Sequence, residues 1–116
     1  LEFAARNGLP GTFIRFFLDN ISLETLCTLL DGKTKLATAR CVFGYYDGRR
    51  LQMFEGGMVG EIATTPAGEQ GFGWDKIFIP AGFACTRASL NETDYQATYT
   101  QIKPFAALKK FLTTTA

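Results

Sequence analysis

One short stretch of the chain, GFGWD at residues 71–75, places two large aromatic rings beside a carboxylate. Glycines on both sides of Phe72 keep side chains away from its ring, which could therefore stack on a flat heteroaromatic ligand, an interaction worth ~1–3 kcal/mol per base. Asp75 could then accept a hydrogen bond from the polar edge of that ligand. The alternative is that Phe72 and Trp74 form a core aromatic pair at the start of a strand. Residue types alone leave both interpretations open.

Two other segments carry residues that could bind a ligand. GLPG at residues 8–11 could be a turn that packs against a ligand, although this pattern is also typical of a plain turn. Arg49 and Arg50 could bind phosphate, but they follow Asp-Gly in a pattern typical of a solvated hairpin tip. The sequence contains no phosphate loop of the GxxxxGK[ST] type.

Composition narrows the class of protein. The 116 residues are 47% hydrophobic, enough for the core of one domain spanning residues 1–116. The net charge of +1 gives no electrostatic case for binding nucleic acid or a membrane surface. No apolar run approaches the ~20 residues that a membrane span needs. We therefore expect neither nucleic acid nor a membrane as a partner.

The absence of histidine and the spacing of the cysteines exclude several kinds of site. Without His, the chain has no Ser-His or Cys-His catalytic pair and no His-based zinc site. Cys27, Cys41 and Cys85 are odd in number and far apart, and the sequence shows no signal peptide. These features favour a reducing, cytoplasmic setting with the thiols buried as small apolar groups.

The first third of the chain predicts a short strand followed by two helices. Residues 1–3 alternate as a strand does, and residues 7–11 form a turn cluster. Clustered apolar residues predict a helix from Phe13, and Ser22 is a typical N-cap for a second helix that ends near Asp31.

The remainder predicts a long hairpin, a third strand and two more helices. Strands are expected at residues 35–46, 51–65 and 75–80, with an Asp-Gly turn joining the first two and a bulge or bend at Gly56-Gly57. The C-terminal helical stretch should break at Pro104. The expected fold is therefore α/β, with a mixed, hairpin-rich β-sheet flanked by helices.

Four segments taken in order carry a family resemblance. GLPGTFIRFF, FEGGMVGEIATTPAGEQGFGWDKIFIP, GFACTRASL and a C-terminal helix together resemble the inosine triphosphate pyrophosphatase family. The resemblance implies hydrolysis of non-standard purine nucleoside triphosphates (ITP, dITP and XTP) to the monophosphate and pyrophosphate. It also implies a homodimer and an ITPase-like fold.

The resemblance assigns roles to five residues. It implies that the segment containing Phe72, Gly73, Trp74 and Asp75 lines the purine pocket, where Phe72 stacks on the base, Trp74 shapes the wall and Asp75 lies near the polar edge of the base. Tyr95 occupies the position of the family's base-contacting Lys.

Several positions depart from the family pattern. The Ser-His-Arg triplet has no counterpart, whether residues 100–102 or residues 102–104 are aligned with it, and the usual Pro and Glu are replaced by Lys76 and Ser89. Losing the Lys and the Arg removes charge-assisted donors, each typically worth ~1.5–3 kcal/mol, that would select a 6-oxopurine. Tyr95, Gln101 and Lys103 are the polar substitutes in that neighbourhood.

The family pattern also includes a strand, a Thr/Ser-x-Asn-x-x-Lys phosphate loop and acidic residues that would precede Leu1. The resemblance therefore implies an N-terminally truncated domain, equivalent to the C-terminal part of the family domain. Mg²⁺ is the implied cofactor, with ligands outside this chain and neither catalytic nor metal-binding residues within it. The alternative is a non-catalytic relic that serves as a structural or heteromeric subunit.

Overall fold

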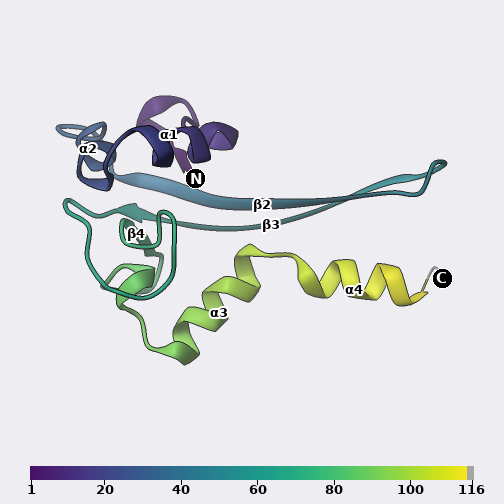
Figure 1. Cartoon of the computed structure of the whole chain (residues 1–116). Coiled ribbons are helices and arrows are strands. Elements are labelled where there is room, and N and C mark those ends of the chain that lie inside the picture. Colours follow the sequence, from purple (N-terminus) through teal and green to yellow (C-terminus); the bar gives the residue numbers. More distant parts are fainter. Residues whose placement is uncertain (115–116) are drawn as a thin grey trace.

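One long β-hairpin forms the centre of the molecule. The computed structural model describes residues 1–114, in which β2 (Leu36–Tyr46) and β3 (Leu51–Ile62) pair antiparallel along their length (Figure 1). The turn is closed by the Asp47 carboxylate, which accepts hydrogen bonds from the backbone N–H groups of Arg49 and Arg50 at 2.9 and 2.8 Å. The hairpin predicted from the Asp-Gly pair is therefore confirmed.

Two short strands complete the sheet. β1 (Glu2–Phe3) pairs with β2, and β4 (Phe78–Pro80) pairs with β3, in the order β1-β2-β3-β4. All the pairings between strands in residues 1–114 are antiparallel, so the expectation of a mixed sheet is wrong. The strand expected over residues 75–80 begins only at Phe78, because Asp75 and Ile77 donate backbone hydrogen bonds within a turn, to the carbonyls of Phe72 and Trp74.

The predicted bulge at Gly56-Gly57 is wrong. The register runs without interruption through Cys41↔Gly56 and Arg40↔Gly57. A Cβ atom at Gly56 would lie 2.3 Å from the carbonyl oxygen of Ile102. This glycine is therefore needed because a helix end approaches the strand closely, and the strand itself stays regular.

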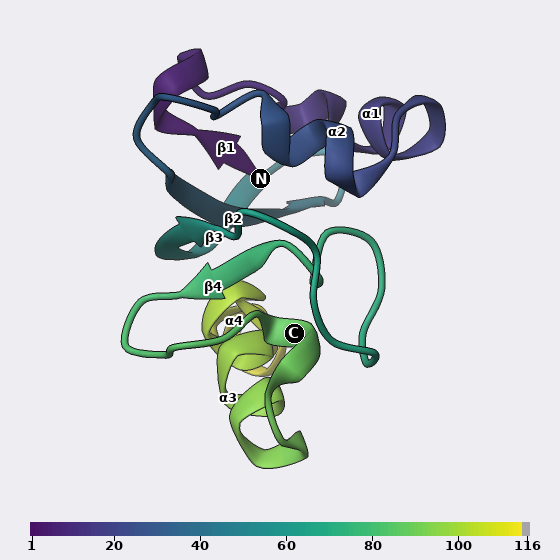
Figure 2. The same ribbon diagram turned by 90° about the vertical axis from the view of Figure 1, so that its left-hand side faces the viewer.

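Helices cover both faces of the sheet, as Figures 1 and 2 show from two directions. α1 (Ile14–Asn20) and α2 (Leu23–Thr28) lie on one face, and α3 (Glu92–Ile102) and α4 (Phe105–Thr114) lie on the other. The Ser22 hydroxyl caps α2 as predicted, accepting from the Thr25 N–H at 3.1 Å. The break between α3 and α4 falls at Lys103-Pro104, also as predicted. The α/β class with a helix-flanked, hairpin-rich sheet is thus confirmed.

The core lies between α2 and the end of the sheet at which β1 and β4 pair with the hairpin. Its fully buried members include Phe3, Leu26, Leu30, Ala39, Ile77 and Phe78. All three cysteines are free thiols, but only Cys27 is buried, so the expected burial of Cys41 and Cys85 is wrong. Within the described residues, no helix is both long and apolar enough to cross a membrane.

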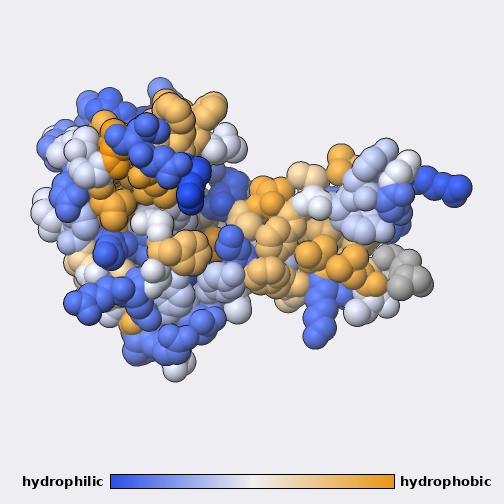
Figure 3. All heavy atoms as spheres, viewed as in Figure 1, coloured by the Kyte–Doolittle hydropathy of each residue, from blue (hydrophilic) through white to orange (hydrophobic). Residues whose placement is uncertain are grey.

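The outer hairpin and α4 project from the rest of the molecule. We call residues 42–55 and 105–114 the arm. Aromatic pairs join α4 to the hairpin, with ring centroids 5.0 Å apart for Phe43–Phe105 and 5.1 Å apart for Tyr45–Phe111. Figure 3 shows apolar side chains gathered along this projection, which gives the molecule its long axis of 49 Å.

Candidate functional site

Residues 72–75 open onto a cleft of about 490 Å³. Its other walls come from the first two residues, from α1, from the middle of β2 and from the end of α3. Residues from both helical layers therefore meet at this cleft. The segment singled out from the sequence lies at its edge.

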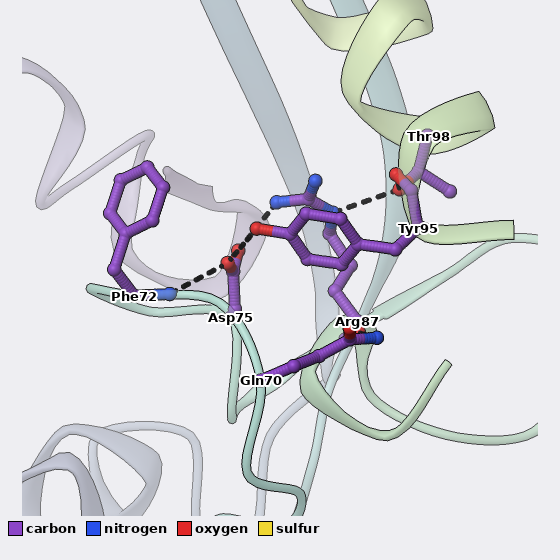
Figure 4. Close-up of polar contacts among 6 residues, drawn as sticks. All are labelled: Gln70, Phe72, Asp75, Arg87, Tyr95 and Thr98. Atoms are coloured by element: carbon purple, nitrogen blue, oxygen red, sulfur yellow. Dashed lines mark hydrogen bonds and ion pairs between the residues drawn. The ribbon is translucent and has the colours of Figure 1, made fainter. Parts of the chain in front are cut away.

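Phe72 and Trp74 take different positions at the cleft. Phe72 is 75% exposed, and its ring points away from the polar residues around Asp75 (Figure 4). Trp74 is partly buried and packs edge-on against the buried Phe78, with ring centroids 5.5 Å apart. Each aromatic residue thus fits a different one of the two interpretations. Phe72 is exposed and available for stacking, whereas Trp74 packs against the core and forms part of the wall of the cleft.

The glycines that flank Phe72 both have positive φ values, which the backbone of the turn requires. Gly71 has a φ of +80°, and a Cβ atom there would lie 2.2 Å from Oδ2 of Asp75. A side chain at this position would displace the carboxylate. Gly73 lines the cleft next to Phe72.

Asp75 is buried, and its hydrogen bonds go to the protein. Its Oδ1 accepts from Nη1 of Arg87 at 2.5 Å, and its Oδ2 accepts from the Phe72 N–H at 3.0 Å and from the Tyr95 hydroxyl at 2.7 Å (Figure 4). Only 3% of Asp75 is exposed. The carboxylate therefore holds the backbone of Phe72 in place and joins the loop to α3.

Arg87 is the residue that the sequence analysis missed. It begins the short 3-10 helix Arg87–Ser89, and its side chain is 6% exposed although it lines the cleft. Its Nε donates to the Thr98 hydroxyl at 3.0 Å, and its guanidinium carbon lies 4.4 Å from the centre of the Tyr95 ring. An arginine between Thr86 and Ala88 carries no local signal of burial, because its partners lie 11 and 12 residues away in the sequence. We call Asp75, Arg87, Tyr95 and Thr98 the Asp75 cluster.

Tyr95 reaches the cluster from α3, at the position where the family resemblance expects a base-contacting Lys. Burial and the hydrogen bond to the Asp75 carboxylate raise the pKa of Tyr95 to about 12. Its hydroxyl thus stays protonated and donates to Asp75 at neutral pH. Of the other expected substitutes, Lys103 lines the cleft, whereas Gln101 is exposed and lies outside its lining.

A second arginine cluster borders the same cleft. Nε of Arg40 donates to Glu2 at 2.7 Å, and Nη1 of Arg40 pairs with Glu55. We call these three residues the Arg40 cluster. Arg15 and Lys103 also line the cleft. Among residues 1–114, the lining therefore contains four basic side chains, including Arg40 and Arg87, and two acidic ones. This excess of positive charge favours an anionic ligand.

The described residues contain no preformed cluster of metal-binding side chains. Within residues 1–114, no group of three or more His, Cys, Asp or Glu side chains is arranged to hold one. Glu55 is engaged by Arg40. In this part of the chain, the Mg²⁺ implied by the sequence resemblance would therefore meet no site built from three such side chains.

Comparison with known proteins gives a consistent result. Residues 1–111 match the model of the Ham1 family. The chain is 40% identical over 115 residues to an inosine triphosphate pyrophosphatase of Yarrowia lipolytica, covering 97% of the chain and 61% of that protein. It is 35% identical over 114 residues to a dITP/XTP pyrophosphatase of Pyrobaculum aerophilum, with the same coverage of both proteins.

Among solved structures, a Ham1 protein from Coxiella burnetii matches with a TM-score of 0.84 and 25% identity, over 97% of this chain and 62% of that one. The chain spans about three-fifths of the length of these relatives.

Proposed function

The chain belongs to the Ham1 family, and we propose that it forms the base-binding part of a nucleoside triphosphate pyrophosphatase for non-standard purine nucleotides such as ITP, dITP and XTP. The reaction would release pyrophosphate and leave the nucleoside monophosphate. We further propose that the segment corresponds to the C-terminal part of a single family domain, which acts in the cytoplasm as a homodimer. Support for the substrate class comes from the inosine triphosphate and dITP/XTP pyrophosphatases to which the chain is similar.

One observation carries the proposal: the Phe72 ring is three-quarters exposed beside a cleft, and its backbone is fixed by a buried carboxylate. A ring held in this way can stack on a purine with little loss of conformational entropy. Trp74 would form the wall beside the base. The basic side chains around the cleft would attract the triphosphate.

We propose that residues 1–114 bind the nucleotide and that the metal ligands lie elsewhere. Pyrophosphate release requires attack of water on the α-phosphorus, and Mg²⁺, our proposed cofactor, would supply charge neutralisation on the phosphates when bound. Its protein ligands would lie outside residues 1–114, which contain no cluster of three or more potential metal-binding side chains. The contribution of these residues would be to bind the nucleotide and orient its base.

Isothermal titration of the chain with ITP tests the proposal. Replacing Phe72 by Ala should weaken ITP binding about 5- to 150-fold, the equivalent of ~1–3 kcal/mol of stacking. Phe16→Ala is the matched control, because Phe16 is 68% exposed and lies outside the cleft lining. Equal losses in the two variants, or no binding of ITP to the unchanged chain, would contradict the proposal.

A non-catalytic subunit is the second candidate, supported by the lack of a metal-ligand set in the described residues. Both candidates predict that the chain alone, mixed with ITP and Mg²⁺, releases no measurable pyrophosphate. They differ for a complex of this chain with a Ham1-family segment that carries the acidic residues. Release by that complex, reduced at sub-saturating ITP by Phe72→Ala, supports the enzyme, whereas a complex that stays inactive supports the subunit.

A further inference from the structure

Arg87 carries a buried donor with no partner. Its Nη2 is the one buried side-chain nitrogen or oxygen atom in residues 1–114 that makes no hydrogen bond, whereas Nε and Nη1 are bonded to Thr98 and Asp75. A buried donor atom that makes no hydrogen bond is costly, so such an atom is rare in a folded protein. In a side chain that also lines a cleft, it is an unfilled position for a hydrogen-bond acceptor.

The rest of the Asp75 cluster fixes this donor in place. The ion pair with Asp75, the bond to Thr98 and the Tyr95 ring under the guanidinium together hold Arg87 in one orientation (Figure 4). The oxygens of Asp75 already accept from Arg87, Phe72 and Tyr95. The cluster therefore offers the ligand a fixed donor, while both oxygens of its carboxylate already accept hydrogen bonds from the protein.

We propose that Arg87 is a specificity-determining residue, whose Nη2 donates a hydrogen bond to a carbonyl oxygen on the base that stacks on Phe72. The inference rests on the proposed function, because it needs a base in the cleft. An amino group at the same edge of the base would place N–H donors against a cationic donor, leaving both without acceptors. Through Arg87, the cleft thus favours binding of an oxopurine over an aminopurine. Tyr95, at the position of the family's Lys, holds Arg87 in place.

A phosphate oxygen of the nucleotide could also accept a hydrogen bond from Nη2. Titration with a series of ligands distinguishes a phosphate acceptor from a carbonyl acceptor on the base. The unchanged chain is titrated with ITP, with purine riboside triphosphate, which keeps the phosphates but lacks the oxo group, and with ATP. We expect ITP to bind at least tenfold more tightly than either of the others, the size of a hydrogen bond to a charged group. Equal binding of ITP and purine riboside triphosphate would overturn the inference while leaving the proposed function standing. No binding of any of the three would overturn both.

The variant Arg87→Lys tests the role of Nη2 by changing the protein instead of the ligand. A lysine ammonium can keep the ion pair with Asp75, but it has no second terminal nitrogen to offer to the ligand. ITP binding should fall at least tenfold and purine riboside triphosphate binding less than twofold, so that the preference between them disappears. Arg49→Gln, which removes a positive charge at the exposed hairpin tip, should leave that preference unchanged.

Circular dichroism and thermal unfolding establish that Arg87→Lys is folded. A folded variant that loses affinity for both nucleotides equally would show that Arg87 supports the cleft without reading the base, which overturns the inference. If the variant does not fold, the ligand series on the unchanged chain decides the question by itself.

Discussion

Two arginine–carboxylate clusters border the same cleft in opposite environments. In the Asp75 cluster, the ion-paired side chains of Arg87 and Asp75 are only 6% and 4% exposed. In the Arg40 cluster, the side chains of Arg40, Glu2 and Glu55 are 44%, 31% and 56% exposed. Both clusters contain an arginine that is ion-paired with a carboxylate, so they differ mainly in how far these side chains are exposed to solvent.

That difference determines what each cluster can do. Water and salt screen an exposed ion pair, which typically contributes less than ~1 kcal/mol to stability. A buried pair costs several kcal/mol to desolvate, and loss of one partner leaves an uncompensated charge in the interior. We therefore expect the Asp75 cluster to set the geometry of the Phe72 loop, and the Arg40 cluster to act mainly as charge at the entrance of the cleft.

The largest expected effect is that of Asp75→Ala. It removes the partner of Arg87 and the acceptor for the Phe72 N–H, so the free energy of unfolding should fall by about 3–5 kcal/mol. Urea unfolding monitored by Trp74 fluorescence measures the change. A loss below about 1 kcal/mol would mean that the two clusters are energetically alike.

A matched double variant separates the charge from the contacts. Asp75→Asn combined with Arg87→Met replaces both charges by neutral groups of similar size. Because no isolated charge is left in the interior, the double variant should be more stable than Asp75→Ala. If the double variant is instead the less stable of the two, an uncompensated charge is not the main cost of losing Asp75.

Tyr95→Phe should have an intermediate effect that depends on pH. At pH 7 it removes a hydrogen bond to a carboxylate, for a loss of about 1–3 kcal/mol. The folded-state pKa of Tyr95, about 12, lies above the unfolded value near 10. The stability linked to this proton is therefore complete below pH 10 and is lost as the pH rises from about 10 to 12.

The difference in stability between the unchanged chain and Tyr95→Phe should accordingly shrink between pH 10 and 12. Tyrosinate absorbance provides a direct check, since one of the four tyrosines should ionise about two pH units above the ordinary value. Titration of all four near pH 10 would contradict the assignment.

The smallest effect is expected for Arg40→Gln. Its two ion pairs are solvent-exposed, so the melting temperature should change by no more than a few degrees. About 1 M NaCl should reduce even this difference, because the Debye length is then ~3 Å. A large, salt-independent loss would show that Arg40 behaves like its buried counterpart.

The fold could be predicted largely from local signals. Asp47-Gly48 located the hairpin, Ser22 located the start of α2 and Pro104 located the break between the last helices. Each of these residues acts on its own backbone or on that of near neighbours. Gly56 misled the prediction because a glycine needed for a bulge and one needed for close packing look identical until the distant Ile102 is placed.

The candidate site was predictable only in part, for the same reason. The exposed ring at Phe72 could be anticipated, because the glycines beside it are local. The partners of Asp75 could not, since Arg87 and Tyr95 lie 12 and 20 residues further along the chain. The hydrogen bonds of a buried carboxylate depend on tertiary packing, which residue spacing alone does not reveal.

The arm has a consequence for how the molecule opens. β1 and β4 pair with the hairpin only near Ala37-Thr38 and residues 60–62, so the outer ladder has two strands and depends on the aromatic contacts of α4. A two-stranded ribbon is marginally stable by itself. Backbone amides of residues 42–46 and 51–55 should therefore exchange with deuterium together with those of α4, as one cooperative unit, while the amides near Ala39 and Met58 wait for global unfolding.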